Sequence, residues 1–411
     1  MHSPSSHVIK LFRVFRELKR RLIIICLTTV AFPIAVLLKI LRPVFPVNVG
    51  FFWVDRIGHH AFDIEYYLCE SVNAGGGVRK WDLFYLEGKP ANDHLRLMTA
   101  KKITCHPFIR YLFYANKLLP ASHLVQVLPA RIRNDSRDKI GLFKQYRPML
   151  RFSDQENDHA FNLLSNIGLN PESKIVCLVV RESAYLAETF PNSNWDHHNF
   201  RDCDIQTYID SAKHLSRLGY WVFRMGKIVN TEFKLSESRV VDYANSDYRS
   251  DFMDIWLMAN CCFCISTGTG LDSVSDIFRR PVVYTNYDSF PLMVTWGDGI
   301  TVPKRLVWRE TGQELSIEEY FSHSFAHTNR YYEAGIDTMA LSSEEITDAV
   351  VELEERVSGK EIVDQRDIEL QKEFWKLFEN CSDYPNYHGV RHPRAQVGRS
   401  YLRASYKSLF R

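Results

Sequence analysis

Short apolar stretches alternate with amphipathic stretches along most of the chain from residue 48 onward. The stretches 48–55 and 81–88 have the residue types of strands, and 59–72 repeats its apolar positions at the spacing of a helix. A second series opens with the apolar run 174–180, which is typical of a strand buried on both faces. This alternation predicts an α/β protein built on parallel sheets.

The second series continues in the same way. Its expected elements are a helix over 204–218, strands over 220–225 and 239–243, a helix over 250–259, a strand that ends near 266, a short helix over 271–279 and a strand from Pro281. A domain boundary is expected near 168–174, where Gly168 and Pro171 end the preceding helix. The tail from 342 is mostly helical and begins with Ser342 or Ser343 as a cap before glutamates.

The first fifty residues have a different pattern. An apolar run over 22–41, nearly long enough to cross a bilayer, ends at Lys39 and Arg42. It follows six basic residues: Lys10, Arg13, Arg16, Lys19, Arg20 and Arg21. Membrane association is therefore expected through 22–41, either as a single crossing or as a helix broken at Pro33 with both ends in the cytoplasm. The alternative is that this apolar run forms a buried helix of the main fold.

Composition narrows the class of protein and its compartment. The chain has 411 residues, 45% of them hydrophobic, and its 51 basic and 49 acidic residues leave a formal charge of +2. This balance argues against a general nucleic-acid binder. Nine scattered cysteines fit reduced thiols better than a disulfide framework. We therefore expect the cytoplasmic face of the inner membrane as the location.

A glycine-bearing turn over 266–270 follows an apolar strand and leads directly into a helix. Backbone N–H groups at such a turn favour a phosphate or diphosphate, and the alternative is a tight turn without a ligand. A Walker loop is excluded, because no Gly-Lys-Ser/Thr follows. A dinucleotide site with Gly268, Gly270 and Asp288 remains an alternative, although Ser273 stands where a third small residue is usual.

Polar side chains also stand at the ends of neighbouring predicted strands. Arg181, Arg224, Asp242 and Tyr243 each end or directly follow a strand. Ligands bind outside the carboxyl ends of parallel strands, so these side chains are expected to converge with the turn on one crevice. Two arginines could neutralise a diphosphate without a metal, and Tyr243 could face a base or sugar. Alternatively, the arginines form ion pairs with neighbouring carboxylates.

Several blocks of the sequence resemble a known bacterial family. They are "DRIGHHAFDIEYYL", "HNFRDCDIQTYIDSAKHLSRLGYWVFRMG", "DYANSDYRSDFMDIWLMANCCFCISTGTGLDSVSDIFRRPVVY", "IELQKEFW" and "VGRSYLRASY". Together they are similar to a family of GT-B glycosyltransferases encoded among surface polysaccharide genes, over roughly 50–411. The resemblance implies two Rossmann-like domains that face each other across a cleft.

The implied domains are a membrane-associated segment 1–47, an acceptor domain 48–170, a nucleotide-sugar-binding domain 171–340 and a helical tail 341–411. The last helix, around 397–410, is expected to cross back to the first domain. The residues that the resemblance places on the donor side are Arg181, Arg224, Gly226, Asp242, Ser246, Asp251, Ser266, Thr267, Gly268, Thr269 and Gly270.

A catalytic base is then expected at the start of the helix that follows the first strand. Asp63 is the first candidate and His60 the second, with His59 beside them on the same helix. The ordinary alternative is that these residues only cap and solvate the helix. No Asp-x-Asp motif ends a strand, so transfer without a metal or cofactor is expected, with the nucleotide-sugar as substrate.

The resemblance thus implies transfer of a sugar from a nucleotide-sugar to a glycan or lipid-diphosphate-linked acceptor, in surface polysaccharide biosynthesis. Two alternatives stay open. One is a noncatalytic sugar-binding or scaffold component of polysaccharide assembly, and the other is an NAD-dependent oxidoreductase.

Overall fold

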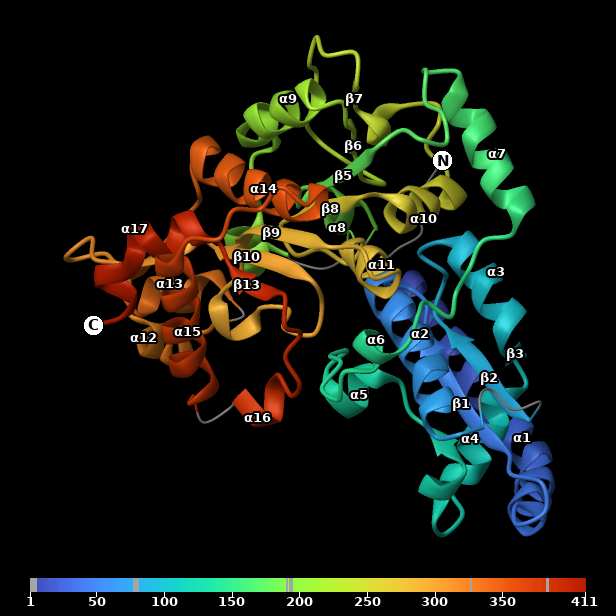
Figure 1. Ribbon diagram of the computed structural model, residues 1–411. Coiled ribbons are helices and arrows are strands. Elements are labelled where there is room, and N and C mark those ends of the chain that lie inside the picture. The colour runs from blue at the N-terminus through green and yellow to red at the C-terminus, as the bar shows by residue number, and fades with distance from the viewer. Residues whose placement is uncertain (1–5, 77–80, 190, 192–194, 326, 382–383) are drawn as a thin grey trace.

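The computed structural model describes residues 6–76, 81–189, 191, 195–325, 327–381 and 384–411. Two parallel sheets organise these residues (Figure 1). The first sheet has the strand order β3-β2-β1-β4. Its strands are β1 (Asn48–Trp53), β2 (Asp82–Glu87), β3 (Thr104–Cys105) and β4 (Gln126–Val127). The helices of this part are α2 (Ile57–Asn73), α3 (Asp93–Lys102), α4 (Ile109–Lys117), α5 (Ala130–Asn134) and α6 (Leu142–Gln145).

The second sheet has seven parallel strands in the order β13-β10-β9-β8-β5-β6-β7. Its strands are β5 (Ile175–Val179), β6 (Trp221–Arg224), β7 (Val240–Val241), β8 (Phe263–Ser266), β9 (Val282–Tyr287), β10 (Gly299–Pro303) and β13 (Ala395–Val397). The chain builds outward from β5 through β6 and β7, and then returns to start again at β8. The strand order therefore reverses between β5 and β8, which is where ligands bind in open α/β sheets.

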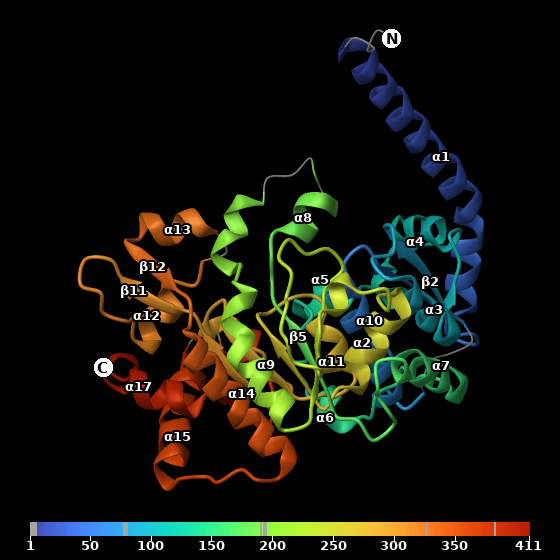
Figure 2. The same cartoon turned by 90° about the horizontal axis from the view of Figure 1, so that it is seen from above.

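Helices cover this second sheet (Figure 1), and a small antiparallel pair lies to one side (Figure 2). The main ones are α7 (Asp154–Ser165), α8 (Ala184–Thr189), α9 (Ile209–Arg217), α10 (Asp251–Asn260), α11 (Asp272–Ile277), α14 (Ser343–Ser358), α15 (Gln365–Glu379) and α17 (Arg399–Leu409). The antiparallel pair is β11 (Arg305–Trp308) with β12 (Ile336–Met339). The prediction of an α/β protein with parallel sheets is confirmed, whereas the GT-B class and the domain limits stay predictions.

Local sequence signals account for several of these elements. All five residues of β5 are buried, as the uninterrupted apolar run predicts. Helix α14 begins with a capping box between Ser342 and Glu345, so Ser342 is the cap. It ends at Gly359, whose φ of +73° suits glycine at a helix end.

Helix α1 (Ser6–Leu41) is one continuous helix that passes through Pro33. The alternative of a helix broken at Pro33 is therefore wrong, and the membrane topology stays a prediction. The segment Val14–Leu41 is long and apolar enough to cross a membrane, and only 11% of its most apolar part is buried. Figure 2 shows α1 projecting from the body of the protein, with its second half beside α4. Ala31 and Ala35 are buried there in an apolar cluster with residues of β1 and α4, whereas many other apolar side chains of α1 are exposed.

The C-terminal tail lies on the second sheet. Helix α17 packs against α14 and α15, and its Tyr401 and Leu402 are buried in the core of this part. The prediction that the last helix crosses to the first domain is therefore wrong, because its apolar face is already covered. Within the tail, it is the segment before β13 that contacts the first part, because the N–H of Val390 donates to the carbonyl of Lys139.

The two parts of the chain meet where α2 packs against α11. Gly58 in the first turn of α2 lies directly against the backbone of Gly270. A Cβ atom at Gly58 would stand 2.8 Å from Cα and 2.9 Å from the carbonyl oxygen of Gly270. Glycine at this position thus lets the two backbones approach each other.

We expect Gly58→Ala to lower the free energy of unfolding by about 1–3 kcal/mol, because the new methyl group meets backbone on the opposite side. Chemical denaturation followed by circular dichroism measures this change. Ser71→Ala on the same helix is the matched control, since its hydroxyl bonds only within α2. A Gly58→Ala protein as stable as the control variant would show that the two backbones can separate freely.

Candidate functional site

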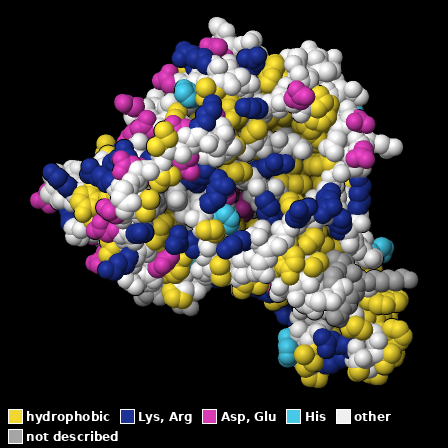
Figure 3. Space-filling model, in the orientation of Figure 1, with side chains coloured by type: hydrophobic (Ala, Val, Ile, Leu, Met, Phe, Trp, Pro, Cys, Tyr) yellow, Lys and Arg dark blue, Asp and Glu magenta, His cyan; other side chains and the backbone are white. Residues whose placement is uncertain are grey.

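A cavity of about 470 Å³ lies between the two sheets, at the point where the strand order of the second sheet reverses. The first part contributes the start of α2, the segment 91–92 and Ser136. The second part contributes residues that follow β5, β6 and β8, together with one face of α11. Figure 3 shows Lys and Arg side chains spread across the middle of one face of the protein, where the two parts meet. This cavity is the candidate site.

Four cationic side chains line the cavity: Arg56, Arg181, Arg201 and Lys227. Carboxylates hold the two inner arginines in place, with Arg181 3.3 Å from Asp202 and Arg201 2.8 Å from Asp288. Burial and the neighbouring Arg201 keep the pKa of Arg181 below its ordinary value. The two guanidinium groups therefore act on one another, and an anion between them would relieve that repulsion.

Sequence reasoning identified Arg181 but missed Arg201, Lys227 and Arg56. Arg201 ends a short 3-10 helix and does not follow a strand, so the strand-end rule did not find it, although it lies in a block of the family resemblance. Lys227 follows Gly226 directly after β6, so the strand-end rule could have found it. Its ammonium group donates to the carbonyl of Ala91 at 2.8 Å and thus joins the two walls of the cavity.

Side chains of the protein itself bond to backbone N–H groups of the turn after β8. The N–H of Thr269 donates to Asp272 Oδ2 at 2.7 Å, and the hydroxyl of Ser266 donates to the same oxygen at 2.6 Å. The N–H of Gly268 is taken by Ser266 Oγ at 3.1 Å. An internal carboxylate thus occupies the place expected for a phosphate. The prediction of open amides is wrong, and the alternative of a turn without a ligand describes it better.

The residues of the turn nevertheless divide into two groups. Gly268, Thr269 and Gly270 line the cavity, whereas Ser266 and Thr267 are fully buried beneath it. The hydroxyl of Thr267 accepts the N–H of Arg181 at 2.9 Å, which fixes the end of β5 next to the turn.

Arg224 has a structural role instead of the predicted donor role. Its side chain is fully buried and does not line the cavity. It donates to Glu182 at 2.7 Å, to Asp242 at 3.1 Å and to the carbonyl of Thr231 at 3.0 Å. The alternative of an internal ion pair is thus confirmed for Arg224 and Asp242. Neither residue lines the cavity, so the prediction that they bind the donor is wrong.

Three further predicted donor residues also lie away from the cavity. Tyr243 is fully buried, with its hydroxyl 2.9 Å from Asp254 Oδ1, so it cannot face a base or sugar. The hydroxyl of Ser246 donates to the carbonyl of Tyr243. Asp251 is the first residue of α10 and accepts the N–H of Asp93 at 2.8 Å, which ties α3 to α10. Gly226, in contrast, lines the cavity as predicted.

Of the three predicted catalytic residues, only His59 lines the cavity. Its Nε2 contacts the guanidinium of Arg131, and its Nδ1 lies 3.4 Å from the hydroxyl of Ser136. Burial, together with the charges of Arg131 and Arg56, lowers the pKa of His59 to about 4. The imidazole is therefore neutral at physiological pH.

His60 and Asp63 point into the protein, because they lie on other faces of α2. His60 is 1% exposed, with Nε2 2.9 Å from the hydroxyl of Thr99. Asp63 is also 1% exposed, and its Oδ1 accepts the N–H of Arg131 at the start of α5 at 3.1 Å. Burial raises the pKa of Asp63 to about 7. Neither residue reaches the cavity, so both predictions of a catalytic base are wrong on this geometry.

Two carboxyl groups form an acidic wall on the side of α11. Asp272 and Asp276 stand four residues apart, and both line the cavity. Burial raises the pKa of Asp272 to about 6 and that of Asp276 to about 7. The indole N–H of Trp296 donates to Asp276 Oδ2 at 2.7 Å. Carboxyl groups in this position suit a hydroxyl-bearing ligand better than a phosphate.

No group of three or more His, Cys, Asp or Glu side chains with the geometry of a metal site occurs among the described residues. Transfer without a metal stays a prediction.

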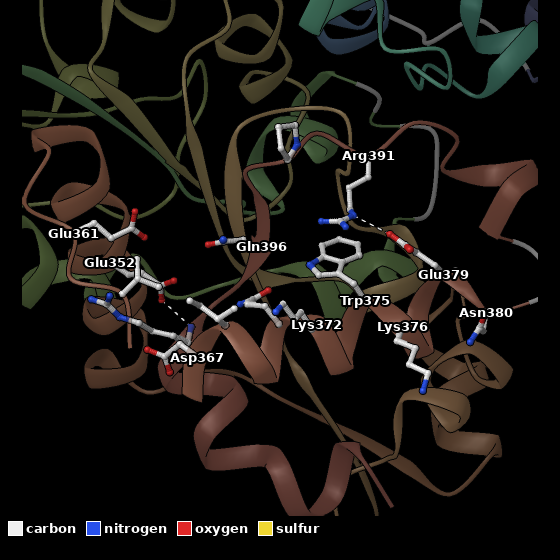
Figure 4. Close-up of a pocket in the computed structure, with 15 residues that line it drawn as sticks. Glu352, Glu361, Asp367, Lys372, Trp375, Lys376, Glu379, Asn380, Arg391 and Gln396 are labelled. Carbon is white, nitrogen blue, oxygen red and sulfur yellow. Dashed lines mark hydrogen bonds and ion pairs between the residues drawn. The ribbon is translucent and has the colours of Figure 1, made fainter. Parts of the chain in front are cut away.

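A second cavity, of about 520 Å³, lies between α14, α15 and β13 (Figure 4). Several of its charged groups pair with one another or with the protein backbone. Arg391 lies 2.8 Å from Glu379 and over the ring of Trp375, and Glu352 accepts the N–H of Arg399. These internal contacts leave the first cavity as the better candidate.

We expect Asp276→Asn to change how stability depends on pH. The folded-state pKa of about 7 lies above the ordinary 3.8, so this carboxyl lowers the stability of the wild type as pH rises from about 4 to about 7. The free energy of unfolding of the variant, measured relative to the wild type, should therefore rise by roughly 3–4 kcal/mol between pH 4 and pH 8. Denaturant unfolding at several pH values measures this difference.

Asp348→Asn, at an exposed position on α14, is the control for this experiment and should give a difference that hardly changes with pH. A flat difference for Asp276→Asn as well would mean that Asp276 is not a buried, protonatable carboxyl.

We expect Arg224→Ala to lower the free energy of unfolding by about 3–5 kcal/mol, because it removes a fully buried cation and leaves the partly buried Glu182 and Asp242 without their partner. Urea unfolding measures the loss. Arg330→Ala removes an exposed ion pair with Glu333 and should cost less than about 1 kcal/mol. If Arg224→Ala stayed as stable as the wild type, the structural role assigned to Arg224 would be wrong.

Comparisons with known proteins add little to this description. No protein-family model matches the chain, and no curated protein matches it. Among solved structures, the chain is similar to the glycosyl transferase family 9 protein from Veillonella parvula DSM 2008, with a TM-score of 0.40 and 13% sequence identity. The similarity covers 63% of this chain and 86% of that chain.

Proposed function

We propose that this protein is a glycosyltransferase that moves a sugar from a nucleotide-sugar donor to a glycan or lipid-diphosphate-linked acceptor, without a metal ion. The observation that carries the proposal is the arrangement of the cavity between the sheets. One wall presents arginines at the switch point of a seven-stranded parallel sheet, and the facing wall presents His59. A nucleotide-sugar has a diphosphate for the first wall, and an acceptor hydroxyl needs a base such as the second wall offers.

The diphosphate of the donor would bind Arg181, Arg201 and Lys227. Arginine binds phosphate oxygens through paired N–H groups, and these side chains already stand fixed at the ends of β5 and β6 or beside the turn after β8. Charge that develops on the leaving diphosphate is stabilised best by groups that do not have to move during the reaction. Three cations held by neighbouring carboxylates and carbonyls meet that requirement without a metal.

The sugar of the donor would lie toward Asp272 and Asp276. Their carboxyl groups can accept or donate hydrogen bonds to sugar hydroxyls, depending on whether they are protonated. The acidic wall and the arginines thus give the cavity a polarity that matches a nucleotide-sugar, with its anionic diphosphate and its neutral, hydroxyl-rich sugar.

His59 would act as the base from the opposite wall. In the transfer, the acceptor oxygen forms a bond to the anomeric carbon while the bond to the diphosphate breaks. The hydroxyl proton passes to the imidazole, and the nucleoside diphosphate leaves with the electron pair. A neutral imidazole at the edge of the cavity has the right protonation state to accept this proton.

The acceptor reaches the site beside a membrane in this proposal. Helix α1 belongs to the same part of the chain as His59, and its exposed apolar side chains suit a bilayer. A protein attached in this way at the cytoplasmic face of the inner membrane could act on a lipid-linked acceptor in surface polysaccharide biosynthesis.

An NAD-dependent oxidoreductase is a weaker candidate on this geometry. The acidic residue that would bind a ribose, Asp288, already holds Arg201, and Asp272 fills the glycine-bearing turn. A noncatalytic sugar-binding component would share the cavity but would not require His59.

We expect the full-length protein in detergent to bind one of UDP, GDP or CDP, as measured by isothermal titration calorimetry. Arg201→Ala should weaken that binding at least tenfold, because it removes a charge-assisted contact with the diphosphate. Arg309→Ala, which removes an exposed pair with Asp337 far from the cavity, is the matched control and should bind as the wild type does.

His59→Gln should retain nucleotide binding and lose transfer of sugar from the matching nucleotide-sugar. Binding of NAD in place of all three nucleoside diphosphates would favour the oxidoreductase. Binding of a nucleotide-sugar with equal, negligible turnover in the wild type and in His59→Gln would favour the noncatalytic component.

A further inference from the structure

The guanidinium of Arg131 contacts one imidazole nitrogen of His59, which is the one predicted catalytic residue that lines the cavity. Arg131 stands near the start of α5, with an exposed side chain. Its guanidinium contacts Nε2 of His59 and lies 5.8 Å from the centre of the ring of Trp53, at the end of β1. His59 lines the cavity, whereas Arg131 does not.

This contact determines which nitrogen of His59 carries the proton. An arginine side chain only donates hydrogen bonds and keeps its charge, so Nε2 must be the acceptor. The proton of the neutral imidazole then lies on Nδ1, toward the hydroxyl of Ser136 at 3.4 Å. In this state, the basic lone pair of His59 is occupied by the guanidinium of Arg131.

Electrostatics also keep His59 a weak base. Besides burial, the groups that act on its imidazole are Arg131 from α5 and Arg56 from the turn before α2, and both lower its pKa. Among the described residues that act on this imidazole, none is a carboxylate. A base with a pKa of about 4 takes a proton from a hydroxyl poorly, because proton transfer is most effective when the pKa lies near the working pH.

The backbone of Arg131 is fixed, although its side chain is exposed. Asp63, buried in α2, accepts the N–H of Arg131 at 3.1 Å and so anchors the start of α5 beside His59. The guanidinium thus begins from a fixed point and can turn toward an anion without any change in the fold. A displaced guanidinium would leave Nε2 free.

We infer that the acceptor carries an anionic group, a phosphate or a carboxylate, close to its reacting hydroxyl, and that this group binds Arg131 and thereby frees Nε2 of His59. The catalytic consequence rests on the proposed function, whereas the contact between the anion and Arg131 does not. The anion pairs with the guanidinium, and the hydroxyl proton then passes to the vacated Nε2. An acceptor without the anion would meet an occupied base, so Arg131 would select for anionic acceptors.

The titration of His59 tests this inference without any donor. The full-length protein, labelled with ¹³C-histidine and held in detergent, is titrated by NMR, with His59→Gln used to assign the signal. Arg131→Ala should move the midpoint of His59 from about 4 toward the ordinary value of 6.5. Arg133→Ala is the matched control on the same helix, because Arg133 pairs with Glu70 instead of His59, and it should leave the midpoint unchanged.

Ligands are then added to the wild type and to Arg131→Ala. Inorganic phosphate, glucuronate and a polyprenyl phosphate in the micelle are the anionic probes, and glucose is the neutral control. At least one anion should raise the midpoint of His59 in the wild type and none should do so in Arg131→Ala. A response to the polyprenyl phosphate alone indicates a lipid-linked source, and a response to phosphate or glucuronate indicates a soluble one.

An unchanged midpoint in Arg131→Ala would overturn the inference, as would equal responses to glucose and to the anions. If anions raised the midpoint of His59 as expected but the protein bound no nucleoside diphosphate, the proposed function would be wrong. The inferred contact between Arg131 and an anion would still stand.

Discussion

The site depends on the close approach of two backbones, at Gly58 in α2 and Gly270 after β8. Because no side chain separates them, the start of α2 lies against the switch point of the seven-stranded sheet. His59 follows Gly58 directly, so the same contact that joins the two parts of the chain also brings the imidazole to the wall opposite Arg181 and Arg201. A side chain at either glycine would widen the cavity and separate the groups that have to act together.

Internal pairing of charges determines which groups remain for a ligand. In the turn, Asp272 accepts the N–H of Thr269 and Ser266 accepts that of Gly268, while Glu182 and Asp242 pair with Arg224, so these groups are already paired within the protein. Arg181 and Arg201 differ because each has one carboxylate partner and both line the cavity, where their charges repel one another. The number of partners around each charge therefore distinguishes the fully buried Arg224 from the two arginines that line the cavity.

Periodicity in the sequence predicted the helices and strands well, because each depends on residues close together in the chain. The strand-end rule led to Arg181 and the family resemblance led to Gly226, and both residues line the cavity. It failed for Arg224, since the partners that bury this side chain, Glu182 and Thr231, come from other loops whose paths the sequence did not reveal. Arg201 was missed for the opposite reason: the loop that brings it to the cavity has no regular pattern.

The choice among the histidines and Asp63 shows how a helix separates neighbouring residues. Successive residues turn by about 100° around an α-helix, so one start of α2 presents His59 to the cavity and His60 to the core. Asp63 is three to four residues further on, yet α5 covers it and converts its carboxylate into a cap for Arg131. The acid that was expected to take a proton instead positions the arginine that controls the imidazole. Coupling of this kind links the first sheet to the chemistry of the cavity through α5.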